Sequence, residues 1–128
     1  MFKKILIANR GEIAVRIIRA CKELDIRTVA IHSDVDNDAM HVRLADESIC
    51  VGSALPNNSY LNIPSIISAI EITGADAVHP GYGFLSESDK FADILTKHDV
   101  KFIGPSSKSI LELGNKSNAL KLANKHSL

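Results

Sequence analysis

The chain contains no tryptophan, two cysteines, four prolines, 5% aromatic residues and no net charge. Fifteen Lys and Arg residues balance fifteen Asp and Glu residues, so the chain lacks the basic surface that binds nucleic acid or an anionic membrane. It also lacks any apolar run near the roughly 20 residues that span a bilayer. We therefore expect neither a nucleic-acid partner nor a membrane partner.

The two cysteines, Cys21 and Cys50, lie in apolar periodic segments without the CxxC spacing of metal and redox sites. We expect both to be buried, reduced thiols, as in a cytosolic protein. The apolar run near the N-terminus breaks at Asn9 and Arg10, too early for the core of a signal peptide. These observations predict a cytoplasmic location.

The 128 residues form one domain's length of chain, and 45% of them are hydrophobic. Short apolar runs alternate with amphipathic segments, and the runs cover residues 4–8, 28–32, 48–51, 75–79 and 101–103. Runs of this kind are typical of parallel strands that are buried on both faces. The alternation predicts an α/β fold, a Rossmann-like doubly wound parallel sheet of about five strands with helices on both faces.

Helices are expected in the intervening segments, where apolar residues recur at helical spacing. The expected helices and their end signals are residues 12–24, residues 39–44, a helix capped by Asn62 or a neighbour and ended by Gly74, a helix that starts at Ser86 or Ser88, and a helical region from Ser106.

Ligands of doubly wound sheets bind at the carboxyl ends of the strands. The stretches expected there are residues 9–12, 33–34, 79–83 and 104–107. The stretch 9–12 begins a partial match to the dinucleotide-binding fingerprint, in which Gly11 is present. Asn9 replaces the first glycine of the fingerprint, and asparagine tolerates a left-handed backbone. Asp34 lies where a ribose-binding acid would, but Glu12 puts a negative charge where a pyrophosphate would lie. A non-catalytic nucleotide-binding module that uses Asn9, Gly11 and Asp34 therefore stays an alternative.

Metal and P-loop sites are not expected. Residues 34–45 begin like a calcium loop, but Ala39 and Ala45 occupy the positions that require Gly and Glu. Residues 104–109 lack the second glycine of a Walker loop. The histidines show no paired ligand spacing.

Two further stretches each allow two interpretations. Gly81 and Gly83 flank Tyr82 directly after an expected strand, which fits either a ligand-binding loop or a tight turn with Tyr82 and Phe84 packed on a neighbour. Arg16, Arg19 and Glu23 share one polar helix face, which is either solvated or a charged interface. An interaction domain that pairs through this helix is thus another alternative.

Several motifs occur in combination along the chain, in residues 7–14, 19–24, 45–47, 59–64, 79–87 and 102–105. With this combination the whole chain resembles the N-terminal domain of the biotin carboxylase family, which includes a subunit of bacterial acetyl-CoA carboxylase and relatives in pyruvate and propionyl-CoA carboxylases. Residues 41–48 are most similar to the acetyl-CoA carboxylase branch. The resemblance implies that residues 1–128 are this domain, and that the segment from about residue 115 leads into an ATP-grasp domain.

The resemblance implies ATP- and bicarbonate-dependent carboxylation of biotin on a carrier protein, with Mg²⁺ (or Mn²⁺) offsetting the phosphate charge, in fatty-acid synthesis. The implied partners are a biotin carboxyl carrier protein, carboxyltransferase subunits and a second copy of the enzyme in a homodimer. Most catalytic residues of the family follow this domain, so we expect none within this chain and expect the chain alone to be inactive.

The resemblance also assigns roles to single residues. Lys116 matches a lysine that binds ATP, although Asn115 stands where the family usually has Asp. Arg16, Arg19 and Glu23 match homodimer-interface positions of some bacterial members. The residues that match a wall of the biotin and bicarbonate pocket are Gly81, Tyr82, Gly83 and, less strongly, Glu87.

Overall fold

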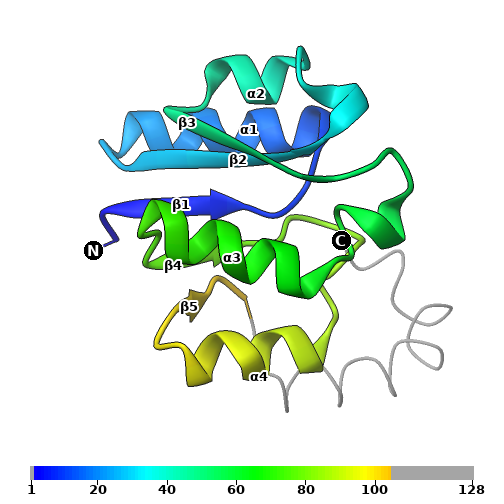
Figure 1. Ribbon diagram of the computed structural model, residues 1–128. Coiled ribbons are helices and arrows are strands. Elements are labelled where there is room, and N and C mark those ends of the chain that lie inside the picture. The colour runs from blue at the N-terminus through cyan, green and yellow to red at the C-terminus, as the bar shows by residue number, and fades with distance from the viewer. Residues whose placement is uncertain (1, 105–128) are drawn as a thin grey trace, which may run out of the picture.

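The computed structural model describes residues 2–104, and these contain one parallel sheet. Its strands are β1 (Lys4–Ile7), β2 (Arg27–Ser33), β3 (Glu47–Gly52), β4 (Ala77–His79) and β5 (Lys101–Phe102). Their order is β3-β2-β1-β4-β5, and each neighbouring pair is parallel (Figure 1). The chain starts in the centre of the sheet, builds one side, and then crosses to build the other. The predicted doubly wound α/β fold is confirmed.

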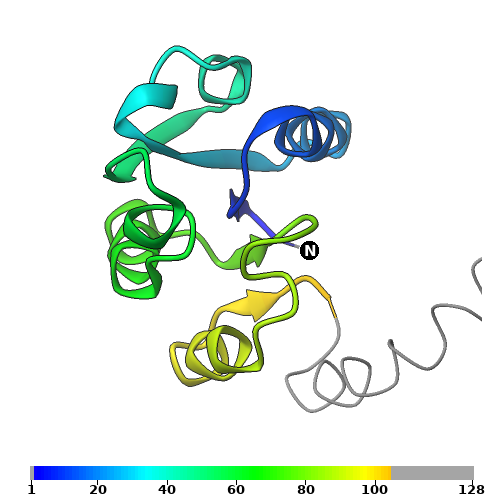
Figure 2. The ribbon, with the colours of Figure 1, turned by 90° about the vertical axis from the view of Figure 1, so that its right-hand side faces the viewer.

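The helices cover both faces of the sheet. They are α1 (Gly11–Glu23), α2 (Met40–Leu44), α3 (Ile63–Thr73) and α4 (Asp89–Lys97), with short 3₁₀ turns η1 (Asp34–Asp36) and η2 (Pro56–Asn58). Helices α1 and α2 lie on one face, and α3 and α4 lie on the other (Figure 2). The chain crosses the sheet in opposite directions before and after β3, and right-handed crossovers in opposite directions place their helices on opposite faces.

The central strand β1 contributes to both apolar layers. Ile5 and Ile7 pack under α1 with Ile18, whereas Leu6 packs under α3 and α4 with Ile66. Successive side chains of a strand point to opposite faces, so a strand with helices on both sides needs a continuous apolar run. Burying one such side chain stabilises the fold by about 1.5–3 kcal/mol.

Helix ends follow the predicted signals. The Asn62 side chain accepts a hydrogen bond from the backbone N–H of Ser65 at 3.2 Å, and Gly74 ends α3 in the left-handed conformation with φ 73°. At the start of α4 the cap is Ser88, rather than Ser86, and its Oγ accepts from the N–H of Phe91 at 3.1 Å. Strand β4 begins later than predicted, because the Asp76 carboxylate binds the N–H groups of Lys3 and Lys4 beside it.

The prediction that strand 48–51 and its cysteine are buried is wrong. Strand β3 is an edge strand, and of its residues only Val51 is fully buried. Ile49 and Val51 pack on the α3 side of the sheet. Because successive side chains of a strand point to opposite faces, Cys50 points to the face of α1 and α2, which these helices cover incompletely, and it is exposed. Cys21 is buried as predicted, and burial raises the pKa of its thiol. None of the helices in residues 2–104 has both the length and the apolarity needed to cross a bilayer.

Candidate functional site

The connections that follow β1, β2, β3 and β4 meet at the carboxyl edge of the sheet (Figure 1). This is where doubly wound sheets bind ligands. The connection between β4 and α4, residues 80–88, is called the β4–α4 loop. It contains every residue predicted for the pocket wall: Gly81, Tyr82, Gly83 and Glu87.

Asn9 joins the end of β1 to this loop. It is 3% exposed, and its Nδ2 donates hydrogen bonds to the carbonyl oxygens of Pro80 at 2.8 Å and Tyr82 at 2.5 Å. Its Oδ1 accepts from the backbone N–H of Arg10 at 2.8 Å. A left-handed backbone at Asn9 does not occur, because the non-glycine residues with positive φ in the described part of the chain are Asp25, Phe84 and Asp99. Asparagine is used here for its side chain.

The glycines of the β4–α4 loop allow a backbone that other residues rarely adopt. Gly81 and Gly83 have φ values of 65° and 70°. A Cβ on Gly81 would also lie 2.8 Å from Nδ2 of Asn9, so this position lacks room for a side chain. Tyr82 between them is 78% exposed. The loop is therefore a tight turn, but one that leaves Tyr82 unpacked.

Phe84 supplies the packing that the turn interpretation predicted. Its ring stacks on Tyr60, with centroids 5.2 Å apart and planes at 25°. Phe84 has φ 45°, which for a bulky residue costs about 1–3 kcal/mol. An aromatic pair contributes about 0.5–1.5 kcal/mol beyond its buried area, so the stack offsets part of this strain. Tyr60 is 2% exposed and thus provides a rigid support.

The hydroxyl of Tyr60 belongs to a charged network. It donates to Oδ2 of Asp36 at 2.7 Å and accepts from the N–H of Ser33 at 3.1 Å. Arg10 donates to both carboxylate oxygens of Asp36, and its guanidinium lies 5.9 Å from the centroid of the Tyr60 ring. The hydrogen bonds from Arg10 hold the pKa of Asp36 well below its usual range. The pKa of Tyr60 is raised, chiefly by burial of its hydroxyl and secondly by the hydrogen bond to Asp36.

His79 anchors the beginning of the β4–α4 loop. Its Nδ1 accepts a hydrogen bond from the backbone N–H of Gly81 at 3.1 Å, which requires a free lone pair on that nitrogen. Burial lowers the pKa of His79 and so favours the neutral ring that has this lone pair. The half-buried imidazole therefore acts as a hydrogen-bond acceptor here.

Sequence reasoning missed the roles of Arg10, Asp36 and Tyr60. In the nucleotide-binding alternative it placed Asp34 as the acid after β2, but Asp34 is exposed and it is Asp36 that binds Arg10. The available signal was the run of aspartates directly after β2, together with the arginine directly after β1, because the ends of these two neighbouring strands lie side by side. Nothing in local spacing pairs Asp36 with Tyr60, because 24 residues separate them.

Other predicted residues lie apart from the loop. Glu87 is exposed within it, whereas Lys116, the predicted ATP ligand, and Asn115 lie outside the described residues. Arg16, Arg19 and Glu23 are exposed on α1, opposite its buried side, as predicted. Arg16 lies 3.5 Å from Glu12 in an ion pair whose side chains are both largely exposed.

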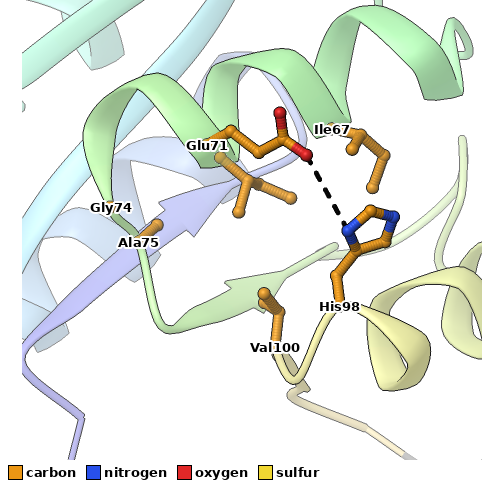
Figure 3. Close-up of a pocket in the computed structure, with 7 residues that line it drawn as sticks. Ile67, Glu71, Gly74, Ala75, His98 and Val100 are labelled. Atoms are coloured by element: carbon orange, nitrogen blue, oxygen red, sulfur yellow. Dashed lines mark ion pairs between the residues drawn. The ribbon is translucent and has the colours of Figure 1, made fainter.

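A separate hollow of about 210 Å³ lies between α3 and α4 at the amino edge of the sheet (Figure 3). Gly74, Ala75 and Val100 line it just before β4 and β5, and Nδ1 of His98 lies 3.8 Å from Oε1 of Glu71 across it. Within residues 2–104, no group of three or more His, Cys, Asp or Glu side chains is placed to hold a metal ion. This hollow therefore lies at the edge of the sheet opposite to the carboxyl edge, and it has no metal-ligand cluster.

Comparison with known families gives a match to the biotin carboxylase N-terminal domain over residues 1–110. The chain belongs to this family. The match covers all the described strands and helices, and it confirms the resemblance inferred from the motifs.

Relatives of this biotin carboxylase domain occur in more than one carboxylase. The chain is 59% identical over 122 residues to the mitochondrial propionyl-CoA carboxylase alpha chain of Caenorhabditis briggsae, covering 95% of this chain and 16% of the relative. It is 58% identical over 125 residues to the biotin carboxylase of Haemophilus influenzae, and this match covers 98% of this chain and 28% of the relative. The chain therefore spans less than a third of the length of these relatives.

A solved structure supports the same fold. The biotin carboxylase domain dimer of the Hydrogenobacter thermophilus 2-oxoglutarate carboxylase, in complex with MgADP, ADP and bicarbonate, aligns with a TM-score of 0.86 and 48% identity. The alignment covers 94% of this chain and 26% of that chain.

Proposed function

We propose that the chain is the N-terminal part of a biotin carboxylase, which uses ATP and bicarbonate to carboxylate biotin on a carrier protein. The family match over residues 1–110 carries this proposal. The MgADP and bicarbonate bound by the Hydrogenobacter relative support these ligand classes. In the enzyme we expect further partners: carboxyltransferase subunits, and a second copy in a homodimer that uses Arg16, Arg19 and Glu23 on the exposed face of α1.

The contribution of this domain is one wall of the biotin and bicarbonate pocket, formed by Gly81, Tyr82, Gly83 and Glu87. The exposed Tyr82 offers an apolar ring and a hydroxyl, a combination suited to a ligand with both apolar and polar edges. Bound Mg²⁺ or Mn²⁺ would offset phosphate charge, but residues 2–104 contain no ligand cluster that fits it. The proposal therefore places the metal ligands outside residues 2–104, and Lys116 as an ATP contact.

The acyl acceptor is proposed to be acetyl-CoA, in fatty-acid synthesis, with the enzyme in the cytoplasm. The support is the similarity of residues 41–48 to that branch. Within the domain these residues pack: Nε2 of His41 bonds the carbonyl of Ile31, and Asp46 accepts from the N–H of Thr28 at 2.8 Å. A transcarboxylation assay of the whole enzyme that compares acetyl-CoA with propionyl-CoA as acceptor tests this assignment.

A nucleotide-binding module that uses Asn9, Gly11 and Asp34 is less well supported. The amide of Asn9 is occupied by the β4–α4 loop, and the acid that bonds to the β1 end is Asp36. The geometry at this edge supports a rigid loop better than a dinucleotide cradle.

The test is a chimera in which this chain replaces the matching segment of the Haemophilus influenzae biotin carboxylase. We expect bicarbonate- and biotin-dependent ADP release from the chimera. The Haemophilus enzyme without its matching segment is the control. A folded chimera without biotin-dependent turnover would contradict the proposed function.

A further inference from the structure

Tyr82 combines an exposed side chain with a backbone that is held on both sides. The residue is 78% exposed, while its carbonyl oxygen accepts from Asn9 and its neighbours Gly81 and Gly83 hold positive φ values. A surface turn that only reverses the chain needs no such restraint. Functional sites, in contrast, place exposed groups on backbone that the surrounding structure determines.

Asn9 provides the restraint before Tyr82. Because the N–H of Arg10 donates to Oδ1, the orientation of the amide is set, and both hydrogens of Nδ2 remain for the carbonyls of Pro80 and Tyr82. Gly81 lies against Nδ2 so closely that a Cβ would clash. The amide thus spans the turn from its inner side, in a place that solvent does not reach.

Phe84 provides the restraint after Tyr82. It stacks on Tyr60, which hydrogen bonds to Asp36, and Asp36 binds Arg10, the residue next to Asn9. Both restraints therefore lead back to the end of β1, although the loop is about 70 residues away in the sequence.

We propose that Asn9 is a positioning residue, whose amide fixes the backbone of residues 80–83 so that Tyr82 faces the biotin and bicarbonate pocket. This inference rests on the proposed function. Asn9 acts through the loop and does not itself touch a substrate. Aspartate cannot replace it. A carboxylate has the same shape as the amide, but it has no hydrogen to donate to the two carbonyl oxygens.

Hydrogen exchange of the 128-residue chain, followed by NMR, tests the positioning. The reporters are the amides of Gly81 and Ser86, whose N–H groups bond to His79 and to the carbonyl of Gly83. In Asn9→Asp we expect both to exchange at least about tenfold faster, since two hydrogen bonds that restrain the loop are lost. The amides of β2 should change less than about twofold.

Asn57→Asp is the matched control, since it makes the same chemical change at an exposed asparagine of η2, and it should leave the loop amides unchanged. If Asn9→Asp does not fold, Asn9→Ala removes the donors without adding charge and is measured instead. Unchanged exchange at Gly81 and Ser86 would overturn the inference. Equal acceleration at the β2 amides would also overturn it, because Asn9 would then stabilise the whole fold.

Kinetics of the chimera separate this inference from the proposed function. In the active chimera, Asn9→Asp should lower kcat/KM for biotin about 10- to 100-fold, because misplaced contact groups lose about this much, and should leave KM for ATP unchanged. An inactive wild-type chimera would contradict the proposed function alone. If the wild-type chimera is active, and Asn9→Asp speeds exchange at the loop amides but leaves kcat/KM for biotin unchanged, the positioning role would be overturned.

Discussion

Arg10 and Asp36 form a bidentate ion pair that joins the connections after β1 and β2. Nε and Nη2 of Arg10 lie 2.8 and 3.0 Å from the two carboxylate oxygens of Asp36. The Asp36 side chain is 12% exposed, although that of Arg10 is 50% exposed. Since Tyr60 donates to the same carboxylate, the charge of Asp36 holds the Tyr60 ring on which Phe84 stacks.

Asp36→Asn should lower the free energy of unfolding at pH 7 by about 1.5–3 kcal/mol, the range for hydrogen bonds to charged groups. Folding lowers the pKa of Asp36, so its contribution is complete above the unfolded pKa of about 3.9 and is lost as the pH falls below it. Urea unfolding at pH 7 and pH 3 should therefore show a smaller difference from wild type at pH 3. The exposed neighbour Asp34→Asn is the control, and a difference independent of pH would contradict the prediction.

Alanine at the two glycines of the β4–α4 loop should have unequal effects. Both positions have positive φ, which costs alanine about 1–2 kcal/mol. At Gly81 the new Cβ would also lie 2.8 Å from Nδ2 of Asn9, whereas at Gly83 it meets nothing within 4 Å. Thermal unfolding should show that Gly81→Ala loses at least about 1 kcal/mol more than Gly83→Ala, the low end for overpacking. Equal losses would show that the contact with Asn9 can relax.

Arg19→Glu should affect assembly rather than folding. Arg19 is exposed on α1, and exposed charges contribute about 1 kcal/mol or less, so the Tm of the chain should remain nearly unchanged. In the chimera the substitution should weaken the dimer, as measured by sedimentation across a dilution series. Lys90→Glu on α4, on the other face of the sheet, is the control. Identical sedimentation of Arg19→Glu and wild type would exclude α1 as the interface.

Lys116→Ala should weaken ATP binding to the chimera about 10- to 100-fold, the equivalent of one charge-assisted contact of about 1.5–3 kcal/mol. Calorimetry measures the dissociation constants of ATP from the wild-type chimera and from the Lys116→Ala chimera. The exposed Lys90→Ala serves as a control for the loss of a positive charge. Equal constants for wild type and Lys116→Ala would remove this lysine from the ATP site.

The purified 128-residue chain should show no ADP release that depends on bicarbonate and biotin, because we expect the catalytic groups of the family to lie outside it. A coupled assay for ADP, with the active chimera as positive control, is the measurement. Turnover that persists through repeated purification would show that this chain carries catalytic groups of its own.

The strands and helix ends could be predicted because each depends on neighbours in the sequence. The apolar run in β1, the cap at Asn62 and the glycine at position 74 express local preferences of the backbone and of its hydrogen-bonding groups. Burial of Cys50 was mispredicted because an edge strand differs from a central one only through its place in the sheet.

The candidate site was predictable in part. Gly81, Tyr82 and Gly83 could be selected because two glycines after a strand are a local signal. The partners of this loop could not be, since Asn9 reaches it across 73 residues and Phe84 stacks on a tyrosine from another connection. Asn9 was noted because asparagine tolerates a left-handed backbone, and the structure instead uses its amide as a double donor.

The sequence by itself determined the α/β fold, the family and the position of the loop that follows β4, because periodicity, caps and motifs act over short distances along the chain. Only the tertiary structure decided which of two acids binds Arg10, which aromatic residue of the loop packs and which stays exposed, and what holds the loop. These contacts form where the carboxyl ends of parallel strands converge, and that convergence exists only after the crossovers have folded.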